Sequence, residues 1–93
     1  MAQISWTKRS IKDLRAINDY ISLDSTFYAK RFVSKLIKRV EILIQFPESG
    51  RIVPEKNVTE IRELIEGNYR IFYQLRRGKI TILRIHNAAR KIK

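Results

Sequence analysis

A chain of 93 residues makes one domain and leaves no room for an enzyme built from separate cofactor and substrate domains. Twenty Lys and Arg against nine Asp and Glu give a formal net charge of +11. Because 44% of the residues are hydrophobic, a disordered basic tail is also excluded. A charge of this size predicts an anionic partner, which is nucleic acid, an anionic membrane or an acidic protein.

The composition restricts the chemistry further. The chain has no cysteine and one histidine, His86, which excludes disulfides, thiolate metal sites and multi-histidine metal sites. We expect no cofactor. No apolar run has the length of a signal peptide or of a membrane span, so we expect a cytoplasmic protein without a membrane partner.

The basic residues are unevenly distributed along the chain. Residues 1–61 hold 11 basic and 7 acidic residues, whereas residues 62–93 hold 9 basic and 2 acidic residues. No acidic residue follows Glu66. We therefore expect the C-terminal third to carry the function.

The first half of the chain predicts a short strand followed by two helices. Ile4 and Trp6 indicate the strand, and Thr7 can cap a helix that begins at about Lys8. Residues 23–25 interrupt the helical pattern, and Asp24 or Ser25 can cap the second helix, which ends at Phe46-Pro47. The short link predicts an antiparallel helical hairpin. Its apolar stripes consist of Ile11, Leu14, Ile17 or Asn18, and Ile21 in the first helix, and Ala29, Phe32, Val33, Leu36, Val40, Leu43 and Ile44 in the second.

The second half predicts an antiparallel meander. Residues 47–56 are typical of a loop, and residues 58–65, 69–75 and 79–86 alternate as strands between Gly-containing turns. The expected fold is α+β in the order β-α-α-β-β-β, an antiparallel sheet with the helical hairpin packed on one face, over a single domain of residues 1–93.

Two registers are open for the last hairpin. A two-residue turn at Arg77-Gly78 mixes charged and apolar side chains on both faces. A three-residue loop over residues 76–78 pairs position 70 with 84 and separates charge from core. We therefore predict the three-residue loop. One face then holds Ile71, Tyr73, Leu83 and Ile85, and the other holds Arg70, Phe72, Ile82, Arg84 and His86. The faces of Arg62 and Glu63 stay open.

The predicted basic face can recognise phosphate. Guanidinium groups of Arg70 and Arg84, with Arg90 a few residues later, bind phosphate bidentately, and Phe72 can stack on a base. For RNA cleavage without a metal, His86 could act as acid or base and Glu63 as a base. The alternative is that these residues are ordinary ion-paired or solvated side chains.

The ordered set of motifs resembles the ParE/RelE superfamily of toxins from type II toxin–antitoxin modules, often named plasmid stabilisation proteins. The resemblance covers essentially the whole chain. Its motifs are Trp6, Asp13-Leu14, Tyr20-Ile21, Ala29, Phe32, Phe46-Pro47, Gly50-Arg51, Val53-Pro54-Glu55, Arg62-Glu63-Leu64, Tyr69-Arg70-Ile71, Tyr73, Ile82-Leu83-Arg84-Ile85-His86 and Arg90.

The resemblance implies the β-α-α-β-β-β fold and a cognate, acidic antitoxin whose disordered segment folds on the toxin, so that a toxin–antitoxin hetero-oligomer forms. RelE-like members cleave messenger RNA on the ribosome, and ParE-like members inhibit DNA gyrase. Arg70 matches the strand arginine of RelE-like enzymes, and Arg90 falls near a second one. However, Ile61 and Glu63 stand where RelE-like members have lysines, and no tyrosine follows Tyr73.

These departures, and the ending His86-x-x-x-Arg90, favour the ParE branch. The predicted function is a growth-inhibiting toxin that acts on DNA gyrase and is neutralised by its antitoxin. One alternative is a ribosome-dependent, metal-independent mRNA endoribonuclease, with Arg70, His86 and Arg90 as catalytic residues and Glu63 as a further base. A lesser alternative is a non-toxic basic module that binds nucleic acid. In the toxin reading, the residues predicted to contact the target or nucleic acid are Arg62, Arg70, Arg84, His86 and Arg90.

Overall fold

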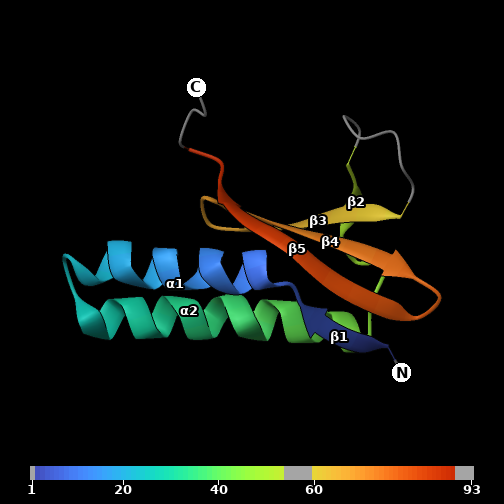
Figure 1. The fold of residues 1–93 in the computed structure, drawn as a ribbon, viewed down its shortest axis with the longest axis horizontal. Helices are drawn as coiled ribbons and strands as arrows, with labels where there is room; N and C mark the ends of the chain where they lie inside the picture. Colours follow the sequence, from blue (N-terminus) through green and yellow to red (C-terminus); the bar gives the residue numbers. More distant parts are fainter. Residues whose placement is uncertain (1, 54–59, 90–93) are drawn as a thin grey trace.

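The computed structural model describes residues 2–53 and 60–89. A five-stranded sheet lies across a hairpin of two long helices, which cover one of its faces (Figure 1). The elements, in chain order, are β1 (Gln3–Trp6), α1 (Lys8–Ser22), α2 (Thr26–Glu41), a short 3₁₀ turn (Ile42–Ile44), β2 (Arg51–Ile52), β3 (Ile61–Glu66), β4 (Tyr69–Arg76) and β5 (Lys79–Asn87).

The helical hairpin forms as predicted, with a side-chain cap on each helix. Thr7 accepts a hydrogen bond from the backbone N–H of Ser10, and Ser25 accepts one from Tyr28. The α-helical part of the second helix stops at Glu41, earlier than expected, and the 3₁₀ turn completes it. This tighter turn keeps Leu43 fully buried in the core before Pro47 ends the helical run.

The strands are ordered β1-β5-β4-β3-β2. The meander β3-β4-β5 is antiparallel, as predicted. The sheet as a whole is mixed, because β1 pairs in parallel with β5. The predicted loop over residues 47–56 contains a strand that sequence reasoning missed: Arg51–Ile52 pairs antiparallel with β3. Two residues are too short to show an alternating pattern.

The predicted register of the last hairpin is wrong. Arg76 pairs with Lys79, so the turn has two residues, and both adopt positive φ (Arg77 50°, Gly78 73°), which is typical of a type I′ turn. A β-bulge then shifts the register between Phe72 and Tyr73, and Arg70 pairs with His86 instead of position 84.

The bulge reconciles this turn with a clean separation of charge and core. Before it, Ile82 lies opposite Tyr73 and is fully buried, so its predicted place on the basic face is also wrong. After it, Ile85 lies opposite Ile71 in the core. Arg70, Arg84 and His86 consequently fall on the other face with Phe72, as predicted. The core between sheet and helices consists of Ile17, Leu36, Val40, Leu43, Leu64, Tyr69, Ile71, Tyr73, Ile80, Ile82 and Ile85.

Candidate functional site

The face of the sheet that points away from the helices carries the predicted basic residues. Two cross-strand pairs of β4 and β5 form it, Arg70 with His86 and Phe72 with Arg84. Cross-strand neighbours on one face have side chains within contact distance. The guanidinium carbon of Arg70 lies 5.0 Å from the centre of the Phe72 ring, a cation–π distance. The structure therefore places Arg70, Arg84 and His86 on one face of the sheet.

Glu63 joins this face from β3, where it lies opposite Phe72. Its side chain is buried, with the residue 2% exposed, and each of its carboxylate oxygens has a guanidinium partner. Oε1 accepts a hydrogen bond from Arg51 Nε at 2.5 Å, and Oε2 accepts one from Arg70 Nε at 2.7 Å and contacts Arg70 Nη2. The negative charge of Glu63 thus neutralises part of the positive charge that we expected to bind phosphate.

Arg62 lies on the opposite face of β3, opposite Tyr73. Its Nη1 donates to the backbone carbonyls of Glu48, at 3.1 Å, and Gly50, at 2.8 Å. Arg62 therefore anchors the loop before β2, and the structure does not bring it together with Arg70.

Tyr73 holds the same loop from inside the core. Its hydroxyl donates to the carbonyl of Pro47 at 2.8 Å and accepts from the N–H of Gly50 at 2.9 Å. Burial raises the pKa of Tyr73 above its ordinary value of 10, against the opposing effect of the Gly50 hydrogen bond. The last tyrosine of the chain is therefore a neutral, buried structural residue on the helix-facing side of the sheet.

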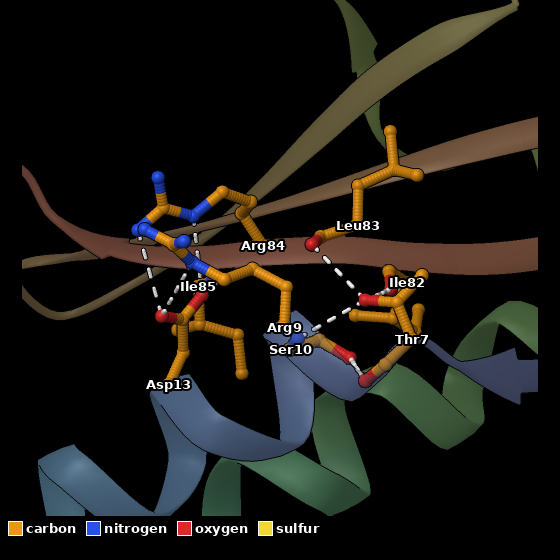
Figure 2. A network of polar contacts seen from close by, with 8 residues as sticks. All are labelled: Thr7, Arg9, Ser10, Asp13, Ile82, Leu83, Arg84 and Ile85. Atoms are coloured by element: carbon orange, nitrogen blue, oxygen red, sulfur yellow. Dashed lines mark hydrogen bonds and ion pairs between the residues drawn. The ribbon is translucent and has the colours of Figure 1, made fainter.

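Arg84 reaches around the edge of β5 to Asp13 of α1 (Figure 2). The Arg84 Nε lies 3.3 Å from Asp13 Oδ2, and Arg9 Nε lies 3.9 Å from Oδ1. Asp13 Oδ2 also accepts the backbone N–H of Ile85 at 2.9 Å. One carboxylate thus satisfies a backbone donor of the bulged strand and pairs two arginines.

Thr7 fixes the start of the same bulge, as Figure 2 shows. Its hydroxyl donates to the carbonyl of Ile82, at 2.9 Å, or of Leu83, at 3.2 Å, while its oxygen accepts the N–H of Ser10. The end of β1, the start of α1 and the bulge in β5 therefore share one residue. Sequence reasoning identified Thr7 only as a helix cap, because its second partner lies 75 residues away.

Two predicted site residues remain, His86 and Arg90. His86 is half-buried beside Arg70, and Arg90 lies outside the described residues. Among residues 2–53 and 60–89, the three acidic side chains near the basic face and its edge, Asp13, Glu60 and Glu63, each pair with arginine. As a set of ion pairs, this face stabilises the sheet. A general base free of a cationic partner would have to be His86.

Comparison with known proteins places the chain in a family. A model of the ParE toxin of the type II toxin–antitoxin system parDE matches residues 4–92. The chain belongs to the ParE toxin family. It is similar to Toxin RelE2 of Caulobacter vibrioides, with 38% identity over 91 residues that cover 97% of this chain and 99% of the relative.

The fold of this ParE-family toxin is similar to that of a solved chain from the chromosomal ParDE TA system of P. aeruginosa. The TM-score is 0.77 at 27% identity, and the match covers 94% of this chain and 96% of the other. The protein is thus a toxin of the type II toxin–antitoxin class, as the sequence motifs predicted. Within the part of the chain that the structure describes, no helix is long and apolar enough to cross a bilayer.

Proposed function

We propose that this toxin inhibits DNA gyrase in the cytoplasm and is neutralised by an acidic cognate antitoxin in a hetero-oligomeric complex. The observation that carries the choice of target is the engagement of Glu63 with Arg70. A nuclease site needs Arg70 directed at a scissile phosphate and a free base for the 2′-hydroxyl. Here Arg70 bonds a buried carboxylate, and Glu63 is held between two arginines.

The position of Tyr73 supports the same proposal. RelE-like enzymes that use a tyrosine need its hydroxyl at the substrate. The Tyr73 hydroxyl is turned into the core and bonded to the loop before β2. A toxin that acts by binding its target needs none of these groups free.

A supercoiling assay with purified gyrase tests the proposal. We expect the toxin to block supercoiling of relaxed plasmid and to leave DNA breaks when it is induced in cells. Normal supercoiling at saturating toxin would overturn the proposal. Heat-treated toxin at the same concentration controls for non-specific binding of a basic protein to the plasmid.

A ribosome-dependent endoribonuclease remains the second candidate function. One geometric observation favours it: Arg70 and His86 lie opposite each other, so a cation and an imidazole could meet one phosphate. Primer extension on messenger RNA after induction would then show codon-linked breaks that Arg70→Ala and His86→Ala abolish. Breaks that persist in both variants would show that these residues do not form the site.

A further inference from the structure

The last part of β5 runs along an edge of the sheet that has no neighbouring strand within the described residues. The pairing of β1 with β5 begins where Gln3 lies opposite Lys79 and ends where Trp6 lies opposite Ile82. After Trp6 the chain turns into α1. Backbone groups that point away from β4 beyond Ile82 consequently need partners from elsewhere.

Two side chains at the start of the helical hairpin take the place of the missing strand (Figure 2). The hydroxyl of Thr7 donates to the carbonyl of Ile82, at 2.9 Å, or of Leu83, at 3.2 Å. Oδ2 of Asp13 accepts the backbone N–H of Ile85 at 2.9 Å. The first contact lies at the bulge and the second lies just after it, so β5 is held on both sides of the register shift.

The bulge decides which way the last residues of β5 face. Ile82 and Ile85 are both buried although they are three positions apart, so the alternation of the strand is reversed between them. Without that reversal, Ile85 would point away from the helices, and Arg84 and His86 would point into the core. The places of Arg84 and His86 on the basic face therefore depend on the bulge.

Asp13 makes two kinds of contact, and the backbone contact is the one that can fix the strand. Its ion pairs with Arg84, at 3.3 Å, and Arg9, at 3.9 Å, involve arginine side chains that are 44% and 61% exposed. Exposed ion pairs contribute little and impose no single geometry. The bond to the N–H of Ile85 is charge-assisted, and it satisfies a donor of a buried residue, whose loss of a partner is costly.

We propose that Asp13 is a positioning residue for the basic face, and that it acts by binding the backbone N–H of Ile85 and not by pairing with Arg84. The carboxylate holds the end of β5 in the reversed alternation, so that Arg84 and His86 stay on the face that carries Arg70. The inference rests on the proposed function only in its functional readout, which takes this face to contact the target.

Three substitutions in the full-length toxin separate these contacts. Asp13→Ala removes both kinds. Asp13→Asn keeps a carbonyl oxygen that can accept the N–H of Ile85 but loses the charge. Arg84→Gln removes one ion pair and leaves the carboxylate in place. The matched control is Asp19→Ala, which makes the same change of charge at an exposed position of the same helix.

Amide hydrogen exchange followed by NMR gives the structural readout. We expect Asp13→Ala to speed the exchange of the Ile85 amide at least about tenfold. In Asp13→Asn, Arg84→Gln and Asp19→Ala, this exchange should stay within about threefold of the wild type. The amide of Ile80, in the half of β5 that pairs with β1, should keep its wild-type rate in all four variants.

Cross-strand contacts report on the basic face itself. Asp13→Ala should weaken the nuclear Overhauser contacts between Arg70 and His86, which lie opposite each other in the wild type. Asp13→Asn should keep them. A merely structural role would lower stability without this separation between the two variants.

Inhibition of gyrase supercoiling gives the functional readout. We expect Asp13→Ala to need at least about tenfold more toxin for half inhibition, because the basic face is no longer held in one geometry. Asp13→Asn should stay within about threefold of the wild type, as should Asp19→Ala.

Several results would overturn the inference. One is an Ile85 amide that exchanges at the wild-type rate in Asp13→Ala, and another is an equal rise at Ile80, which indicates a general loss of stability. Faster exchange of Ile85 in Arg84→Gln would assign the register to the ion pair, and this measurement decides even where Asp13→Ala does not fold. A wild-type toxin that leaves gyrase active would overturn the choice of target, whereas the exchange rates would still decide the role of Asp13.

Discussion

The carboxylate of Glu63 and the guanidinium of Arg70, from adjacent strands, form a charge-assisted pair on the face of the sheet opposite the helices. Arg51 closes the cluster from β2. A carboxylate with both oxygens bonded to guanidinium groups is held strongly, and its loss leaves two neighbouring cations without a counter-charge.

Glu63→Gln should therefore destabilise the toxin by on the order of 2 kcal/mol, since Arg51 and Arg70 can turn partly towards solvent. Urea unfolding followed by circular dichroism measures the change. The matched control is Glu60→Gln, because Glu60 is more exposed and lies 3.5 Å from Arg76. We expect the control within about 0.5 kcal/mol of the wild type. Equal losses in both variants would contradict the role of Glu63.

The buried hydroxyl of Tyr73 predicts a loss of stability in alkali. Because burial raises the pKa of Tyr73 in the folded protein, the unfolded chain loses this proton first as the pH rises. The contribution is fully present below the ordinary value of 10 and is lost as the pH rises through the folded pKa.

Tyr73→Phe isolates this effect from the lysines, which titrate in the same range. The variant should lose about 1–3 kcal/mol at pH 8, because Gly50 N–H and Pro47 C=O lose their partner. Its free energy of unfolding should fall less steeply than that of the wild type above pH 10. Parallel curves would show that Tyr73 does not titrate differently on folding.

Substitution of Gly50 and of Gly78 by alanine should destabilise the toxin for different reasons. A Cβ at Gly50 would lie 2.5 Å from the Tyr73 hydroxyl and 2.8 Å from the Glu63 carbonyl, so Gly50→Ala should cost about 3 kcal/mol or more. At Gly78 a Cβ meets nothing within 4 Å, and Gly78→Ala should cost only the backbone penalty, about 1–2 kcal/mol. Thermal unfolding of both variants compares the two costs. A larger cost at Gly78 would contradict the packing around Gly50.

The turn at Arg77 offers a gain in stability. Arg77 adopts φ of 50°, a conformation that Asn accepts more readily than Arg does. Arg77→Asn should stabilise the toxin by about 1 kcal/mol. Arg77→Ala removes the same charge without easing the backbone, and it should give no such gain. Equal stabilisation by both substitutions would mean that charge repulsion, not the backbone, limits stability at this turn.

The separation of charge from core was predictable, but the way in which the chain achieves it was not. A two-residue turn followed by a bulge brings Arg70, Arg84 and His86 to one face, as the expected three-residue loop would have done. The two solutions differ at Ile82, which is fully buried, and at Leu83, which was predicted for the core face and lies outside the core. The bulge moves the next buried position of β5 after Ile82 to Ile85, and Thr7, which donates a hydrogen bond to the Ile82 carbonyl, lies at the other end of the chain.

The ion pairs of the candidate site were equally beyond sequence reasoning. Arg84 pairs with Asp13 across 71 residues, and Glu63 could be assigned to Arg70 only after the β3–β4 register was known.

The parallel pairing of β1 with β5 has a consequence for how the toxin is made. Residues 3–6 bond residues 79–82, so the sheet closes through contacts between the first and last strands of the chain. Such contacts raise the contact order and slow folding. During synthesis the helical hairpin emerges long before β5 exists, so β1 has no strand to pair with until translation is nearly complete. The sheet therefore closes only after β5 has been synthesised, whereas the helical hairpin can form earlier in translation.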